Sequence, residues 1–250
     1  MAYRRDSDLE FLGQMDSSDL DDLVYCLLYD KDGDPRLTEE LSQNSEYKRY
    51  SPDHSQYWRE IAAEVQCFGA NSFATIFRGG EGVPYREVLT DVCDHLKVNY
   101  NSNSNIEKIE NNLLMSILER ALEEMSQSEI RDLANELGIK NMSNLNAQMM
   151  TGIFQKVFTM GGFKSYQLTV IIVNAIMKAL IGRGLSFGGN ILLTRTVGIL
   201  TGPIGWAITA VWTLVDIAGA AYRVTVPSVI LIAAMRQKHL YADAAESISF

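Results

Sequence analysis

Apolar residues recur every three or four positions along most of the chain, which is the period of an amphipathic helix. The longest such stripe covers residues 106–125, and shorter ones predict helices at 57–68, 71–77, 85–96 and 144–160. Ser126 and Glu129 form a capping box for a further helix, which Gly138 ends. Residues 8–28 predict two short helices separated by a capping break at 16–18. No segment shows the alternation typical of a strand. The pattern therefore predicts an all-α fold, built as a multi-helix bundle.

The C-terminal third contains the most apolar part of the chain. Residues 196–215 carry no charge, but a Gly-Pro pair at 202–203 interrupts them and leaves runs too short to span a bilayer alone. With the neighbouring runs at 168–177 and 224–235 they predict a C-terminal hydrophobic helical hairpin over 168–235. Two interpretations stay open for this hairpin: it is buried in the core of the protein, or it associates with a membrane.

Charge is distributed unevenly and suggests a division into regions. Residues 1–149 hold 14 basic and 28 acidic side chains, whereas residues 150–240 hold 8 basic and one acidic. We predict a short helical N-terminal module at 1–50 and an acidic helical domain at 51–149. A glycine-rich apolar hairpin region follows at 150–240, and a polar tail at 241–250.

The acidic balance argues against a nucleic-acid partner, because phosphate contacts need clustered Lys and Arg. The basic residues of the apolar third suit either an anionic membrane surface or the acidic head of the same chain. Residues 1–11 are polar and the three cysteines are widely spaced. We therefore expect a cytoplasmic protein with reduced thiols, either free or held at the inner membrane peripherally or by the hairpin.

Two groups of residues in the apolar third are candidates for contacts. Aromatic and proline residues suit a membrane interface or a protein partner: Pro203, Trp206, Trp212 and Tyr222. Asp216 is the single acid of this third, and a carboxylate in apolar surroundings needs a partner. We expect a structural ion pair with one of three arginines, namely Arg223, Arg183 or Arg195.

No catalytic, metal or cofactor site is predicted. The loop at 30–41 begins like a calcium-binding loop, but Pro35 and Leu41 occupy the positions that need Gly and Glu. Neither His54 nor His95 has ligand or triad spacing, and no small-molecule substrate is identified. An enzyme would need a polar pocket around Asp91, Asp94 and His95.

Three stretches together resemble one family. Residues 6–41 (DSDLEFLGQMDSSDLDDLVYCLLYDKDGDPRLTEEL) are similar to the N-terminal module of the YaaW-like family of uncharacterised bacterial proteins. Residues 57–98 and 202–236 look like its middle and C-terminal segments. The middle region of such proteins also has a distant resemblance to the ubiquinol–cytochrome c chaperone family, whose members assist the assembly of a respiratory complex. This resemblance implies a helical fold and supplies no activity, cofactor or functional residue.

Two functions are expected from these observations. The first is a non-enzymatic interaction protein whose hydrophobic hairpin is buried or contacts a membrane. The alternative is an assembly chaperone for a membrane-protein partner, with a helical groove between residues 57 and 125 that holds an apolar segment of its client.

Overall fold

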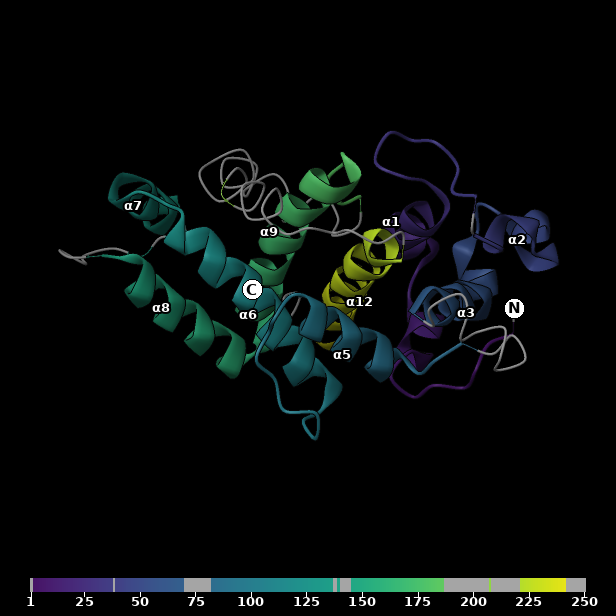
Figure 1. The fold of residues 1–250 in the computed structure, drawn as a ribbon, viewed down its shortest axis with the longest axis horizontal. Coiled ribbons are helices and arrows are strands. Elements are labelled where there is room, and N and C mark those ends of the chain that lie inside the picture. Colours follow the sequence, from purple (N-terminus) through teal and green to yellow (C-terminus); the bar gives the residue numbers. More distant parts are fainter. Residues whose placement is uncertain are drawn as a thin grey trace, which may run out of the picture.

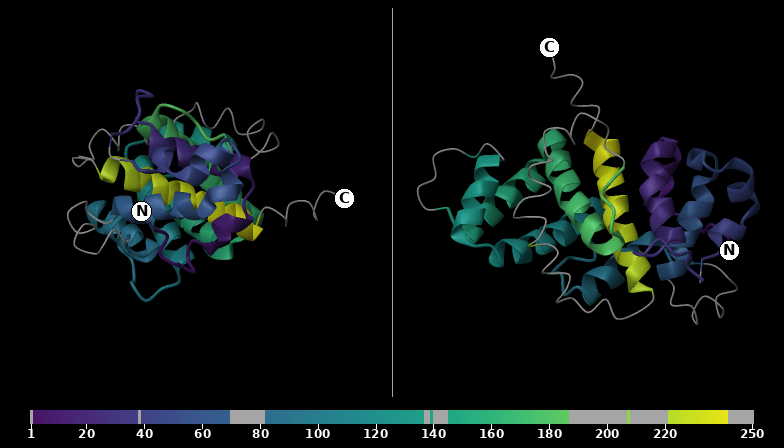
Figure 2. Two further views of the ribbon diagram at one scale, coloured as in Figure 1. Left: turned by 90° about the vertical axis from the view of Figure 1, so that its right-hand side faces the viewer. Right: turned by 90° about the horizontal axis from the view of Figure 1, so that it is seen from above.

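The computed structural model describes residues 2–37, 39–69, 82–136, 139, 145–186, 207 and 221–241. Every regular element in these ranges is a helix, and an isolated bridge joins Tyr29 to Pro35. The prediction of an all-α fold is thus confirmed. Helices α9 and α12 occupy the centre, with α1, α2 and α3 on one side and α6, α7 and α8 on the other (Figures 1 and 2).

The N-terminal part contains short helices joined by tight turns. A 3-10 helix, η1 (Glu10–Gln14), precedes α1 (Ser17–Leu28), so two short helices form as predicted. The break between them lies at Met15 and Asp16 and not at 16–18, because α1 already begins at Ser17. Two further 3-10 helices, η2 (Leu41–Gln43) and η3 (His54–Tyr57), flank α2 (Ser45–Tyr50). The loop before η2 is closed by Asp30, whose Oδ1 accepts the N–H groups of Asp32 and Asp34, each at 2.9 Å.

The middle helices follow the predicted boundaries closely. They are α3 (Trp58–Gly69), α5 (Tyr85–His95), α6 (Ile106–Glu123) and α7 (Gln127–Glu136). The capping box forms as predicted, because Ser126 N donates to Glu129 Oε2 at 2.7 Å and Glu129 N donates to Ser126 Oγ at 3.4 Å. The predicted helix at 71–77 lies outside the described residues.

Three longer helices complete the described fold: α8 (Ala147–Met160), α9 (Gly162–Ile181) and α12 (Tyr222–Tyr241). Among the described residues, α9 is long and apolar enough to cross a membrane, and most of its side chains are buried inside the protein. It packs mainly against α12. The structure does not show the predicted C-terminal hairpin, since α9 lies centrally and most of the chain between α9 and α12 is outside the described residues.

Helix α12 also packs along α1, which ties the two ends of the described chain together. Cys26 of α1 is fully buried, with its Sγ 3.7 Å from Ser228 Oγ of α12. Lys238 of α12 donates to Asp19 of α1. All three cysteines are free thiols, with Cys26 and Cys93 buried and Cys67 half-buried.

Candidate binding groove and the polar network beside it

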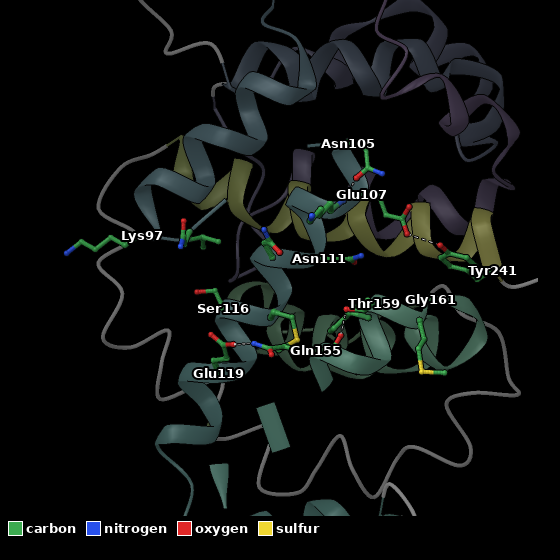
Figure 3. Close-up of a pocket in the computed structure, with 17 residues that line it drawn as sticks. Lys97, Asn105, Glu107, Asn111, Ser116, Glu119, Gln155, Thr159, Gly161 and Tyr241 are labelled. Atoms are coloured by element: carbon green, nitrogen blue, oxygen red, sulfur yellow. Dashed lines mark hydrogen bonds between the residues drawn. The ribbon is translucent and has the colours of Figure 1, made fainter. Parts of the chain in front are cut away.

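An open groove of about 930 Å³ lies between α6 and α8. The loop before α6 closes one side, and Tyr241 at the end of α12 borders the other (Figure 3). Residues of α6 spaced three or four positions apart reach it, because such residues share one face of a helix. The full lining is Lys97, Val98, Asn99, Asn105, Glu107, Lys108, Asn111, Asn112, Met115, Ser116, Glu119, Gln155, Phe158, Thr159, Met160, Gly161 and Tyr241.

The groove combines an apolar base with a polar wall. Val98, Met115 and Phe158 are buried, so they contribute apolar surface where the groove meets the core, and Met160 is 72% exposed at its edge. The polar wall consists mainly of amides and hydroxyls that hydrogen-bond as both donor and acceptor. A surface of this kind suits a flexible or peptide-like occupant that offers apolar groups together with amides.

Two carboxylates stand towards the two ends of the α6 wall, and each is held by neutral donors. Glu107 Oε1 accepts the Tyr241 hydroxyl at 2.9 Å and Gln237 Nε2 at 3.3 Å. Glu119 Oε1 accepts Gln155 Nε2 at 3.1 Å (Figure 3). Neither carboxylate forms an ion pair with any residue that the structure describes. The groove therefore holds two negative charges without a cationic partner in that part of the chain.

The wall of the groove is anchored to the core through Gln237. Its Nε2 donates to Glu107 Oε1 and to Asn111 Oδ1, both at 3.3 Å, and its Oε1 accepts Ser165 Oγ at 3.2 Å. Gln237 and Ser165 are both buried. This chain of bonds joins α9, α12 and α6, so the α6 wall of the groove is tied to the buried core.

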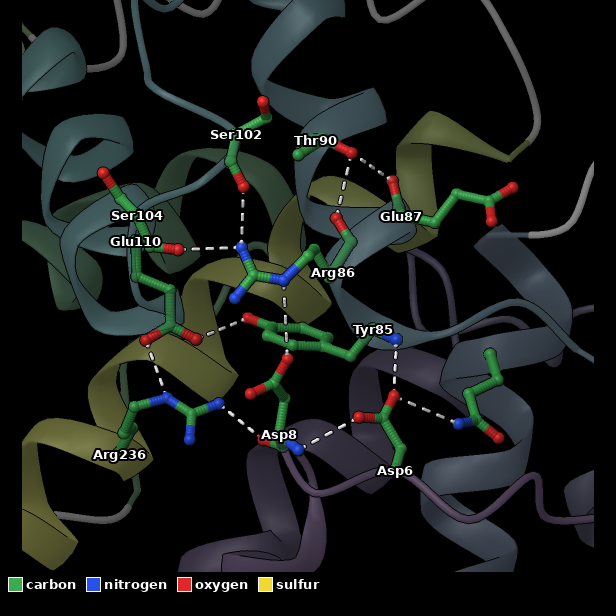
Figure 4. A network of polar contacts seen from close by, with 11 residues as sticks. Asp6, Asp8, Tyr85, Arg86, Glu87, Thr90, Ser102, Ser104, Glu110 and Arg236 are labelled. Atoms are coloured by element: carbon green, nitrogen blue, oxygen red, sulfur yellow. Dashed lines mark hydrogen bonds and ion pairs between the residues drawn. The ribbon is translucent and has the colours of Figure 1, made fainter.

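A buried ion pair lies one turn away on the opposite side of the same α6 segment. Arg236 Nε donates to Glu110 Oε2 at 2.8 Å, and Glu110 is 1% exposed (Figure 4). The Tyr85 hydroxyl donates to the other carboxylate oxygen of Glu110 at 2.8 Å. Burial raises the pKa of Glu110, and the Arg236 guanidinium opposes that rise. Burial also raises the pKa of Tyr85 well above its ordinary value.

The same network binds the N-terminal segment. Arg236 Nη2 donates to the backbone carbonyl of Asp8 at 2.6 Å, and Tyr85 N donates to Asp6 Oδ2 at 2.6 Å. Asp8 pairs with Arg86 at 3.9 Å, and Arg86 also donates to the carbonyl of Ser104 at 2.8 Å (Figure 4). Glu110, Tyr85 and Arg236 thus satisfy one another in a closed interior, and the network is structural.

Comparison with known proteins assigns this architecture to a family. Residues 53–230 match the model of the ubiquinol-cytochrome C chaperone family, and residues 3–37 match a domain of unknown function, DUF3944. A UPF0174 protein of Helicobacter pylori is 54% identical over 243 residues, covering 97% of this chain and 96% of that protein. The chain belongs to the UPF0174 family.

More distant UPF0174 relatives also match along nearly their whole length. YaaW of Escherichia coli is 29% identical over 240 residues, covering 94% of this chain and 95% of that protein. A second Helicobacter pylori UPF0174 protein is 45% identical over 206 residues, 81% of this chain and 98% of that protein. No solved structure matches. The chaperone match includes every lining residue of the groove except Tyr241.

The three residues considered for an enzyme active site, Asp91, Asp94 and His95, do not converge on a common pocket in this UPF0174 fold. Asp91 and Asp94 are exposed on α5, and Asp94 accepts the Tyr100 hydroxyl at 2.9 Å. His95 is half-buried and stacks on Tyr222, with ring centroids 3.8 Å apart. In the described ranges no group of three or more His, Cys, Asp or Glu side chains is arranged to hold a metal ion.

His54 has a carboxylate partner that the sequence analysis missed. Its Nε2 lies 2.9 Å from Asp21 Oδ1, and its Nδ1 contacts the Tyr57 hydroxyl. Burial lowers the pKa of His54, and Asp21 opposes the change. Tyr57 is only 1% exposed, so its hydroxyl cannot reach a substrate. The cluster therefore joins η3 to α1 as a structural contact.

The predicted contact residues of the apolar third are only partly visible. Tyr222 is half-buried against His95, and Arg223 is exposed. Arg183 donates to Asp22 of α1 at 2.8 Å and lies 4.1 Å from the centroid of the Tyr25 ring. Outside the described residues lie Pro203, Trp206, Trp212, Arg195 and Asp216.

Sequence reasoning missed the Arg236–Glu110 pair, although a signal for it exists. Glu110 falls within the apolar stripe of α6, between Ile109 and Leu113, where a charged side chain faces the core. Arg236 directly follows an apolar run in α12. Two opposite charges at such positions indicate a buried pair, but only a structure shows that they meet.

Proposed function

We propose that this member of the UPF0174 family is a non-enzymatic, chaperone-like protein that holds a segment of a protein partner in the groove between α6 and α8. The observation that carries the proposal is the position of that groove: all its lining residues except Tyr241 lie within the region that matches the chaperone family. Its base is apolar, its wall is rich in amides, and it is open to solvent along α6. A polypeptide offers the matching combination of side chains and amides.

The distribution of charged groups favours a protein partner over the other classes considered. The net charge of −9 disfavours nucleic acid, because phosphate contacts need a basic surface. Catalysis needs a nucleophile, acid or base that converges on one reacting atom. In the groove the polar groups are instead spread along α6 and α8, an arrangement that suits the binding of an elongated segment.

The proposal includes a cytoplasmic location, which the three free thiols support. Membrane contact is a separate proposal and concerns the residues between α9 and α12. The buried side chains of α9 and α12 already contact each other and the core. Exposing them to lipid would break those contacts.

The test is site-specific photo-crosslinking in living cells. Benzoylphenylalanine is placed at Ser116 or Thr159, which line opposite sides of the groove, and at Asn135, which is exposed on α7 as a matched control. We expect one dominant protein, identified by mass spectrometry, at both groove positions and not at the control. The same set of proteins at all three positions, or general chaperones alone, would contradict the proposal.

A further inference from the structure

The charge inside the groove points to the kind of segment that it binds. We infer that the groove selects an extended segment carrying two basic side chains about five residues apart, one for Glu107 and one for Glu119. This inference rests on the proposed function, since it describes the partner of the same groove. Three features of the groove support it: the charges of the wall, its length, and its polar side chains that have no hydrogen-bond partner among the described residues.

The first feature is the absence of compensating charge at the two carboxylates. Both are half-buried and accept hydrogen bonds only from neutral groups among the described residues. Lys97 and Lys108 also belong to the lining, but both are exposed and Lys97 points away from the other labelled residues (Figure 3). A half-buried carboxylate gains more from a cation than one in open water, because screening is weaker there.

The second feature is the spacing of the two carboxylates. Glu107 and Glu119 stand twelve positions apart on α6, which corresponds to about 18 Å along the helix axis. An extended chain advances about 3.3 Å per residue, so five or six residues cover that length. Basic side chains at both ends of such a segment can meet the two carboxylates together.

The third feature is the wall between the carboxylates. Asn112 and Ser116 line it, are half-buried, and have no hydrogen-bond partner for their side chains in the part of the chain that the structure describes. Asn111 uses its Oδ1 for Gln237 and keeps its amide hydrogens available. An extended segment presents free backbone N–H and C=O groups to such a wall, whereas a helix has already paired its own. Its apolar side chains would cover Met115 and Phe158.

The test uses two fluorescein-labelled peptides of equal composition. The first, Gly-Lys-Leu-Ala-Leu-Ala-Lys-Gly, has its lysines five residues apart; the second, Gly-Lys-Lys-Leu-Ala-Leu-Ala-Gly, has them adjacent. Fluorescence anisotropy with the full chain should give tighter binding of the first. Glu107→Gln and Glu119→Gln should each weaken that binding by about two- to fivefold, the range for one partly exposed ion pair.

Glu123→Gln is the matched control, because Glu123 is exposed on the same helix and does not line the groove. It removes the same charge and should leave the affinity unchanged. Thermal unfolding of each variant checks that the fold is kept, which the glutamines allow because their Oε1 still accepts. Equal binding of both peptides, or an equal effect of all three variants, would overturn the inference.

The crosslinking experiment separates this inference from the proposed function. When a partner is captured at Ser116 and Thr159, mass spectrometry also identifies the captured segment. A segment with two basic residues at the expected spacing supports the inference. A captured segment without them overturns the inference and leaves the proposed function standing. Failure to capture any specific partner overturns the proposed function itself.

Discussion

At the scale of single residues, the most consequential contact is the buried pair between Arg236 and Glu110. Taking two charges out of water is costly, and their attraction repays that cost only when each is fully satisfied. Here the carboxylate accepts from both Arg236 and Tyr85, each at 2.8 Å. The pair is therefore most sensitive to the loss of one partner.

Arg236→Met should lower the free energy of unfolding by about 3–5 kcal/mol, because it leaves the Glu110 carboxylate buried and unpaired. Arg223→Met is the matched control on the same helix, since Arg223 is exposed. It should change stability by less than about 0.5 kcal/mol. Urea unfolding of both variants measures the difference. Similar small effects would mean that water reaches Glu110 when the arginine is removed.

A second residue of interest is Glu64, which is 2% exposed and accepts the backbone N–H of Glu40 at 3.1 Å. Burial raises the pKa of Glu64 to about 7. The folded state then binds the proton more tightly than the unfolded state. This contribution to stability is fully present below the unfolded pKa near 4.5 and is lost as pH rises through about 7.

Through Glu64 the wild-type protein should lose about 2 kcal/mol of unfolding free energy between pH 5 and pH 8, and Glu64→Gln should abolish this loss. The glutamine keeps an acceptor for Glu40 and cannot ionise. Glu60→Gln, one turn earlier on α3, makes the same change of charge and should keep the pH dependence of the wild type. Urea midpoints across this pH range test the prediction, and parallel curves for all three proteins would contradict it.

At the scale of helices, two glycines have opposite roles. A Cβ on Gly82 would lie 2.6 Å from the backbone carbon of Gln66, so α3 and the segment leading to α5 approach too closely for any side chain. A Cβ on Gly152 in α8 would meet nothing within 4 Å. One glycine permits a contact between elements, and the other only weakens its helix.

Gly82→Ala should therefore destabilise the protein, and Gly152→Ala should stabilise it by up to about 1 kcal/mol, the helix propensity difference between the two residues. Thermal unfolding of the two single variants compares them directly. The signs should be opposite. A stabilising Gly82→Ala would mean that the close approach at Gln66 relaxes without cost.

Helices were the most predictable level of this structure, because their signals are local. The stripe at 106–125 and the Ser126–Glu129 box depend on residues three or four apart, and both appear in α6 and α7. The groove depends on contacts between distant residues, such as Glu119 with Gln155 and Glu107 with Tyr241. No periodicity within one helix specifies which helix will lie beside it, so the groove's actual walls were not predicted.

The central position of α9 has a similar explanation. A run of apolar residues is compatible with a core helix and with a membrane helix, since both exclude water. The choice depends on whether other helices cover it, and α12, α8 and α6 do so here. The sequence alone left both interpretations open for this reason.

At the scale of the whole molecule, the two ends of the described chain are joined. Helix α1 packs on α12, Lys238 bonds to Asp19, and Arg236 holds the backbone of Asp8. The residues matched by the N-terminal domain family are thus part of the same core as the chaperone match. The two regions should unfold as one unit.

Native-state hydrogen exchange tests this unity. The slowest amides of α1 and α12 should exchange with the same opening free energy, and that value should equal the global free energy of unfolding. Helix α7, which lies at one end of the molecule (Figure 1), provides an internal comparison and should open at lower cost. Exchange of α1 at a much lower free energy than α12 would show that the N-terminal region opens on its own.

The burial of Cys26 between α1 and α12 also provides a natural reporter. Its Sγ faces Ser228, and burial raises the pKa of its thiol to about 11, so alkylating reagents meet neither an accessible nor an ionised sulfur. Iodoacetamide can modify it only during the intervals when the two helices separate. The rate of that modification therefore reports how often α1 and α12 separate. A bound protein partner that stabilises α12 would lower this rate.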